Sequence, residues 1–228
     1  MTSADSRPAA VLLDFSRTLF HLWFTAESLA DIRVDGRPLS AADRARAADV
    51  LTAASTALPA ELRADWDRRD LDAEVHRTVY LAALRCAGLD APGVAETLYE
   101  RMIDPAEWQP YPDTRAALER LRAAGVPVAV VSNIAWDIRN IFALRGLAEL
   151  VDEFVLSYAE GVVKPDPKIF RLACDRLGVP PADTLMIGDN EEADSGASAV
   201  GARVEIIPGV PPDQRPDGLL TALAKHGL

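Results

Sequence analysis

The 228-residue sequence is short of several features, and each shortage excludes a class of protein. It holds 24 lysines and arginines against 35 aspartates and glutamates, so it lacks the clustered basic charge with which proteins bind nucleic acid. No apolar run reaches the roughly 20 residues needed to cross a bilayer. The first residues contain no basic region followed by an apolar stretch. We therefore expect a cytoplasmic protein with neither a nucleic-acid nor a membrane partner.

Cysteine and lysine are also scarce. The two cysteines, Cys86 and Cys174, belong to no group spaced like metal ligands, and both lie in helical patterns, which favours buried, reduced thiols. Only three lysines occur, and none of them lies in residues 20–108. No internal repeat or low-complexity tract is evident. The length suits one large domain or one domain with an insert.

What the sequence does contain is a set of five short apolar runs, at residues 10–14, 127–131, 154–157, 184–188 and 204–207. Near-continuous apolarity over such lengths is typical of strands covered on both faces, as in parallel sheets. Helical patterns over 113–124 and 166–177 alternate with these runs, and each is followed by a glycine that can end a helix. This alternation predicts an α/β fold with a doubly wound parallel sheet.

The interval between the first two runs breaks the alternation. It is far longer than a simple crossover connection. Residues 20–108 show helical periodicity over 41–57, 71–87 and 94–102, and no convincing strand signal. We therefore predict a mostly helical domain at 20–108, inserted into an α/β core formed by residues 1–19 and 109–228.

Reactive side chains stand where the apolar runs end or between them. In open α/β sheets, ligands bind at the carboxyl ends of the strands, so such residues are candidates for catalysis or binding. Each one taken alone would also fit a helix cap, a turn or a solvated loop. In chain order they are Asp14 and Thr18, then Ser132 and Asn133, then Lys164 before a proline, and finally Asp189 and Asp194.

Taken in this order, the four motifs resemble those of the haloacid dehalogenase superfamily, from residue 11 to about residue 194. The resemblance implies a Rossmann-like core and, at residues 20–108, the mobile cap that this superfamily carries after its first motif. It implies that Asp14 attacks phosphorus and forms an aspartyl-phosphate that water then cleaves. It also implies a Mg²⁺ ion held by Asp14, the backbone carbonyl of Ser16 and Asp189, with Asp194 as a further ligand or as a partner of those ligands.

The remaining roles follow from the same resemblance. The Ser132 hydroxyl and the backbone amides of a helix predicted to start just after it are expected to hold phosphate oxygens, with Asn133 beside them. Lys164 suits a phosphoryl oxygen and also the carboxylate of the nucleophile. Arg17 places a cation beside the site or points into water. The implied function is a Mg²⁺-dependent hydrolase of a small phosphorylated metabolite.

The sequence departs from the phosphatase pattern at Ser16. Phosphatases of the superfamily carry a second Asp there, which protonates the leaving oxygen and later activates water, and such help is worth roughly 10²- to 10⁴-fold in rate. Arg17 replaces the usual Gly. His21 is a candidate substitute for the missing acid. Two alternatives stay open: a degenerate member that binds a phosphorylated ligand or a protein partner with little turnover, and a 2-haloacid dehalogenase, which Ser132 and Asn133 would suit but Ser16 and Asp189 would not.

Substrate selection is expected to lie in the helical insert. The absence of lysine there removes the Schiff-base chemistry of phosphonoacetaldehyde hydrolases, and the absence of a membrane span removes the ion-pumping ATPases. The polar and aromatic residues of the insert that could reach a bound leaving group are Trp23, Arg33, Arg37, Trp66, Arg68, Arg69, His76 and Tyr80.

Overall fold

The computed structural model describes residues 7–228, and the chain falls into two compact units. The α/β unit comprises residues 7–21 and 108–228, and the helical unit comprises residues 22–107. The expectation about the first residues of the chain lies largely outside the described residues, at 1–6. Among the residues that the structure describes, no helix has the length and apolarity that crossing a membrane requires.

The α/β unit is built on a parallel sheet with the strand order β7-β6-β1-β8-β9. Each strand lies within a residue or two of a predicted apolar run, which confirms the α/β class and the parallel sheet. Since β1 is central, its carboxyl end is flanked by those of β6 and β8. The strands are β1 (Ala10–Leu13), β6 (Val128–Ser132), β7 (Glu153–Leu156), β8 (Thr184–Gly188) and β9 (Arg203–Ile206).

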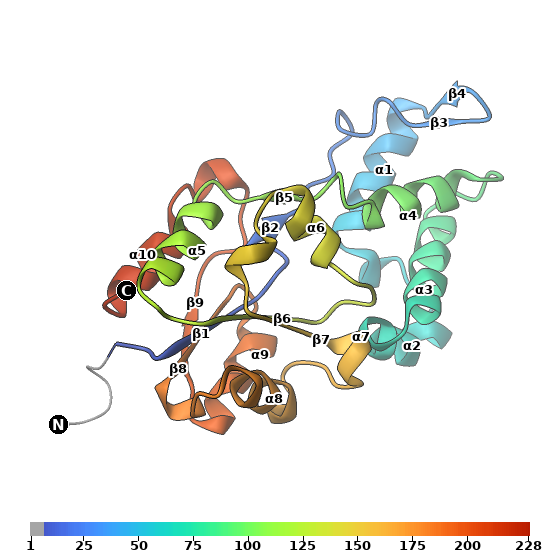
Figure 1. The fold of residues 1–228 in the computed structure, drawn as a ribbon. Helices are drawn as coiled ribbons and strands as arrows, with labels where there is room; N and C mark the ends of the chain where they lie inside the picture. Colours follow the sequence, from blue (N-terminus) through green and yellow to red (C-terminus); the bar gives the residue numbers. More distant parts are fainter. Residues whose placement is uncertain (1–6) are drawn as a thin grey trace. The chain divides into compact units, whose positions relative to one another are not determined.

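Helices cover both faces of this sheet (Figure 1). Leu12, Ala129 and Met186 of the sheet pack against Ile169 and Phe170 of α8, and all five are fully buried. Figure 1 shows α5 and α10 side by side on the opposite face. The helices and 3₁₀ turns are α5 (Thr114–Ala123), α6 (Arg139–Leu144), α7 (Ser157–Glu160), α8 (Pro167–Leu177), α9 (Glu191–Asp194), α10 (Gly218–Lys225), η5 (Ala148–Leu150), η6 (Pro181–Asp183), η7 (Ser195–Val200) and η8 (Pro212–Gln214).

Helix α8 begins and ends at residues that are typical of helix ends. The Asp166 carboxylate accepts a hydrogen bond from the Lys168 amide, and Pro167 occupies the first turn, where its missing N–H costs nothing. The helix ends at Gly178, whose φ of 67° is left-handed. The predicted helix over 166–177 is confirmed.

Two short strands pair where the chain leaves and re-enters the α/β unit. β2 (Phe20–His21) is antiparallel to β5 (Gln109–Pro110). Phe15, which follows Asp14, and Phe20 both stack near Phe142 of α6, with ring centroids 6.0 and 4.8 Å from it. These buried rings anchor both ends of the loop that follows Asp14.

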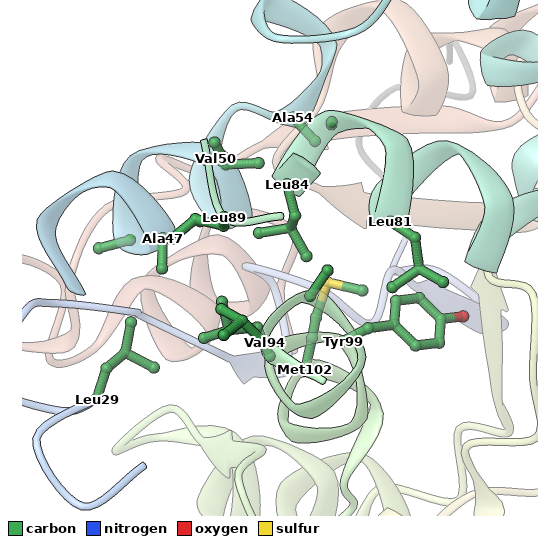
Figure 2. Packing of buried hydrophobic residues seen from close by; sticks show 14 of the residues in the cluster. Leu29, Ala47, Val50, Ala54, Leu81, Leu84, Leu89, Val94, Tyr99 and Met102 are labelled. Carbon is green, nitrogen blue, oxygen red and sulfur yellow. The ribbon is translucent and has the colours of Figure 1, made fainter. Parts of the chain in front are cut away.

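The helical unit has its own core, which packs Leu84 of α3, Leu98 of α4 and Ala47 of α1 without exposure to solvent. Figure 2 shows part of this cluster, with Leu84 and Met102 among its members. Burying a large aliphatic side chain stabilises a fold by about 1.5–3 kcal/mol. The elements are β3 (Arg33–Val34), β4 (Arg37–Pro38), α1 (Ala41–Thr52), η2 (Ala54–Thr56), η3 (Ala60–Leu62), α2 (Arg63–Arg68), η4 (Arg69–Leu71), α3 (Ala73–Cys86) and α4 (Val94–Ile103).

Three sequence predictions were wrong in detail. The helical unit contains the hairpin β3–β4, whose turn residues Asp35 and Gly36 have φ of 50° and 74°. The helix expected directly after Ser132 begins only at Arg139. Of the two cysteines, Cys174 is buried as predicted, but Cys86 at the end of α3 is exposed.

Candidate active site

The strand ends bring the predicted residues to one edge of the sheet. The Asp14 amide, just past β1, donates to the Ile187 carbonyl of β8 over 3.0 Å. Asp189 follows the end of β8, and Ser132, with 2% exposure, ends β6 on the other side of β1. Three of the four motifs therefore meet because their strands are neighbours and parallel.

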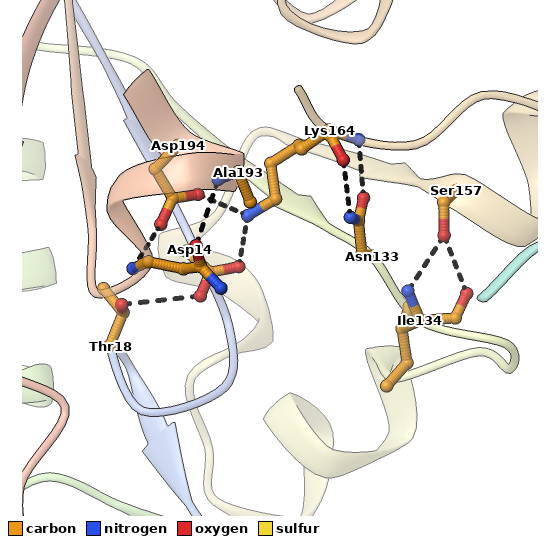
Figure 3. A network of polar contacts seen from close by, with 9 residues as sticks. Asp14, Thr18, Asn133, Ile134, Ser157, Lys164, Ala193 and Asp194 are labelled. Carbon is orange, nitrogen blue, oxygen red and sulfur yellow. Dashed lines mark hydrogen bonds and ion pairs between the residues drawn. The ribbon is translucent and has the colours of Figure 1, made fainter. Parts of the chain in front are cut away.

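Lys164 joins two of the acidic residues (Figure 3). Its Nζ donates to Oδ1 of Asp14 and to Oδ1 of Asp194, each over 2.6 Å, and all three side chains are nearly inaccessible to solvent. The second oxygen of Asp194 accepts from the Asn190 amide over 2.9 Å. A Cβ at position 188 would lie 2.0 Å from that oxygen, so glycine is required there. Asp194 is thus fixed by its surroundings and in turn fixes Lys164.

The loop after β6 is tied to the loop that carries Lys164. Asn133 Oδ1 accepts from the Lys164 amide over 2.7 Å, and its Nδ2 donates to the Lys164 carbonyl over 2.9 Å (Figure 3). Ser157 accepts from the Ile134 amide over 2.9 Å. The Asn133 side chain therefore positions Lys164, and the Ile134 amide, which was expected at a helix start, is already used. The roles of Ser157 and Asn190 could not be predicted from the motifs, because each depends on how a neighbouring loop packs.

A group of carboxylates around Asp14 suits a cation. Asp14, Asp189 and Asp194 each offer an oxygen, and these oxygens lie within 4.8 Å of one another. Burial raises the pKa of Asp14 to about 7; the charge of Lys164 opposes this shift, whereas those of Asp194 and Asp189 add to it. Burial and Asp194 likewise raise the pKa of Asp189. Three carboxylates facing one ammonium leave an excess of negative charge that a divalent cation would balance, and oxygen donors are those Mg²⁺ prefers. The residues present fit Mg²⁺.

The loop after Asp14 supplies the remaining predicted groups. Thr18 Oγ1 lies 3.5 Å from Asp14 Oδ2. Among the described residues, nothing donates to the Ser16 carbonyl oxygen, which leaves it available to a cation. Arg17 adopts a left-handed φ of 60°, its side chain is exposed, and its charge lowers the pKa of Asp189, against the raising effects of burial and Asp194. Arg17 therefore faces the Asp189 side of the site.

The environment of His21 does not suit the role of the missing acid. Its half-buried ring packs edge-on against Tyr111, with centroids 5.1 Å apart. Burial and the charge of Arg215 lower the pKa of His21, so the imidazole is neutral at physiological pH and carries no proton to donate as a cation.

Several candidate specificity residues serve the packing of the helical unit. His76 is 4% exposed, stacks on Tyr80 with centroids 4.5 Å apart, and its Nδ1 lies 3.0 Å from the Tyr99 hydroxyl. The Arg69 guanidinium lies 4.0 Å from the centre of the Trp66 ring. The arginines of this group that remain exposed are Arg33, Arg37 and Arg68.

Comparison with known proteins agrees with this geometry. Residues 9–201 match the haloacid dehalogenase-like hydrolases, so the chain belongs to that family. The chain is 37% identical over 139 residues to haloacid dehalogenase-like hydrolase domain-containing protein 3 of Bos taurus, covering 60% of this chain and 55% of that protein. It is 35% identical over 128 residues to the phosphoserine phosphatase of Thermus thermophilus, covering 55% and 51%. The chain thus spans about half the length of these relatives.

A solved structure extends the likeness to nearly the whole chain. The L-2-haloacid dehalogenase of Xanthobacter autotrophicus is 25% identical, with a TM-score of 0.63, over 94% of this chain and 83% of that one. The relatives therefore include both a phosphatase and a dehalogenase, and the site residues of this chain must decide between the two activities.

Proposed function

We propose that this protein is a Mg²⁺-dependent phosphatase of a small phosphorylated metabolite that reacts through an aspartyl-phosphate on Asp14. The observation that carries the proposal is the group of three carboxylates at Asp14, Asp189 and Asp194, of which the buried Asp14 and Asp194 share an ion pair with Lys164. This excess of negative charge suits a divalent cation and, with it, a phosphate dianion. The likeness to a phosphoserine phosphatase supports phosphoryl transfer.

In the proposed reaction, Asp14 is the nucleophile, and Lys164 and Ser132 position the reacting groups. One carboxylate oxygen of Asp14 bonds to phosphorus as the ester P–O bond breaks, and the alcohol leaves with a proton from solvent. Water then attacks phosphorus, which releases inorganic phosphate and restores Asp14. Lys164 orients the attacking carboxylate, and the Ser132 hydroxyl donates to a phosphoryl oxygen.

The candidate ligands of Mg²⁺ are the carboxylates of Asp14 and Asp189 and the Ser16 carbonyl. When bound, the ion would neutralise charge between the anionic nucleophile and the anionic phosphate. Asp194 would be a further ligand or would support these ligands through Lys164, whose Nζ donates to one of its oxygens. We assign selection of the leaving group to the helical unit, which corresponds to the superfamily's cap.

Ser16 sets the character of the enzyme. It offers no carboxylate to protonate the leaving oxygen or to activate water, and His21 is neutral. We therefore expect phosphate esters with good leaving groups, such as aryl phosphates, to react faster than alkyl phosphates.

Dehalogenation of a 2-haloacid is the second candidate, supported by the likeness to the Xanthobacter autotrophicus enzyme. Against it stands Asp189, a half-buried carboxylate whose pKa is raised by burial and by Asp194, so that keeping it charged carries a cost that a cation would offset. The third candidate is a degenerate family member that binds a phosphorylated ligand or a protein partner with little turnover, and Ser16 alone favours it.

One assay separates the three functions. Wild-type protein is given an aryl phosphate and, separately, 2-chloropropionate, each with Mg²⁺ and with EDTA. We expect Mg²⁺-dependent phosphate release, abolished in Asp14→Asn and kept in Asp175→Asn, a control on the exposed side of α8. Chloride release that ignores EDTA would point to the dehalogenase, and neither product would point to the binding protein.

A further inference from the structure

A buried arginine from the C-terminal part of the chain holds the loop after Asp14. Arg215, which follows η8, is 4% exposed. Its Nη2 donates to the Thr18 carbonyl over 2.7 Å and its Nη1 to the Arg17 carbonyl over 3.1 Å. Arg215 thus binds the backbone of Arg17 and Thr18, nearly 200 residues earlier in the sequence. These two residues directly follow Ser16, whose carbonyl is a candidate cation ligand.

The surroundings of Arg215 are shaped to hold its guanidinium in place. The group lies 3.5 Å from the centre of the Tyr111 ring, and the Tyr111 hydroxyl donates to the Val210 carbonyl over 2.8 Å. A Cβ at position 218 would lie 2.6 Å from both Cγ and Cδ of Arg215, so Gly218 leaves the space that the side chain fills. The buried carboxylate of Asp113 adds electrostatic attraction.

The loop needs such support because of Arg17. A non-glycine residue with a left-handed φ, here 60°, is strained unless its surroundings hold it. The Arg17 amide donates to the Phe20 carbonyl over 2.6 Å, and Arg215 holds the carbonyl on the other side of the same residue. A charged donor makes stronger hydrogen bonds to carbonyls than a neutral one does. Both ends of the strained residue are therefore fixed.

We propose that Arg215 is a positioning residue, which keeps residues 16–18 in the conformation that cation binding and reaction at Asp14 require. The inference rests on the proposed function, since its test measures Mg²⁺ binding and phosphate release. It also accounts for Arg17 at a position where the superfamily's phosphatases carry Gly: the guanidinium supplies the restraint that a non-glycine residue needs.

The test compares Arg215→Lys with Arg145→Lys. Lysine keeps the positive charge but lacks the planar fork that places two separate nitrogens on the Arg17 and Thr18 carbonyls and packs on the Tyr111 ring. Arg145 is the matched control, because its guanidinium also binds a backbone carbonyl of the α/β unit, that of Trp108, outside residues 16–18. The readouts are the Mg²⁺ concentration at half of the maximal thermal shift, and kcat and KM for an aryl phosphate well below the melting temperature.

We expect Arg215→Lys to raise the half-saturating Mg²⁺ concentration and to lower kcat, each about tenfold or more, as the loss of one charged hydrogen bond would. The control should change only the melting temperature. Glycine adopts the left-handed conformation freely, so adding Arg17→Gly to Arg215→Lys should restore much of the Mg²⁺ affinity, measured against Arg17→Gly alone. Gly218→Ala, which crowds Arg215, should show a smaller defect of the same kind and provides a second variant if the lysine protein folds poorly.

The two proposals fail in different ways. If wild-type protein responds to Mg²⁺ and releases phosphate but Arg215→Lys matches Arg145→Lys in both readouts, the positioning role is overturned and the proposed function stands. If adding Arg17→Gly to Arg215→Lys does not restore Mg²⁺ affinity, the inference that Arg215 acts by holding Arg17 in its left-handed conformation is also overturned. If wild-type protein shows neither response, the proposed function fails, and the inference falls with it.

Discussion

Replacing Lys164 by Met should destabilise the protein strongly in the absence of Mg²⁺. Lys164 Nζ is the only group that makes an ion pair with both Asp14 and Asp194 among the described residues, at 2.6 Å from each. Without it, the buried carboxylates of Asp14 and Asp194 and the half-buried carboxylate of Asp189 would share one site. Breaking a buried pair by removing one partner costs about 3–5 kcal/mol, because a buried charge is left uncompensated. Protonation of Asp14 limits the loss at lower pH: its pKa is about 7 with Lys164 present and rises further without the Lys164 charge, so the measurement is made at pH 8 and above.

The assay is urea unfolding of Lys164→Met and of Lys168→Met, each with EDTA and with saturating Mg²⁺. Lys168 is the control because it lies four residues away on the exposed side of α8. In EDTA the Lys164 variant should lose several kcal/mol and the Lys168 variant little. Mg²⁺ should recover part of the loss, since a ligand of the folded state stabilises it by mass action. Equal stability of the two variants in EDTA would refute the view that Lys164 compensates a buried excess of negative charge.

Three further predictions concern other parts of the chain. Ser16→Asp should raise turnover of alkyl relative to aryl phosphates, by up to roughly 10²- to 10⁴-fold, and an unchanged rate ratio would show that another group supplies the acid. Gly209→Ala should weaken the Mg²⁺-dependent thermal shift, because its Cβ would lie 2.4 Å from Asp189 Oδ2; an undiminished shift would remove Asp189 from the ligands. Burial lowers the pKa of His76 from 6.5 to about 3, so the unfolded chain binds the extra proton below pH 6.5 and stability falls as the pH drops, by about 2 kcal/mol at pH 5. His76→Gln should flatten this acid limb of the stability curve, and a curve that keeps its slope would contradict the assignment.

The sheet was predictable because its strands are short and buried on both faces. Such strands read as uninterrupted apolar runs, and Asp14 and Asp189, which follow β1 and β8, stand out against them. The hairpin β3–β4 was also signalled, by the Asp35–Gly36 pair that favours its turn, but two-residue strands carry too little pattern to be noticed. The exposure of Cys86 depends on where α3 ends, and helix ends are the least certain feature of a sequence pattern.

The sequence predicted which residues form the site but not the contacts between them. Asn133 and Lys164 were both identified, but their mutual hydrogen bonds depend on how two loops meet after the strands have paired. The spacing of Ile134 and Ile138 resembles a helix, yet the Ser157 hydroxyl takes the Ile134 amide and α6 starts later. Arg215 carries no local signal at all, since its partners lie nearly 200 residues earlier in the chain. Contacts of this kind follow from the tertiary fold.

The most direct test of the central claim is to trap the phosphorylated protein. Wild-type protein and Asp14→Asn are mixed with an aryl phosphate and Mg²⁺, quenched in acid within milliseconds, and analysed by mass spectrometry of the intact chain and its peptides. We predict that the wild-type chain gains one phosphoryl group on the peptide that contains Asp14, and that Asp14→Asn gains none. Phosphate release without any adduct on that peptide, or an adduct on another residue, would contradict the account.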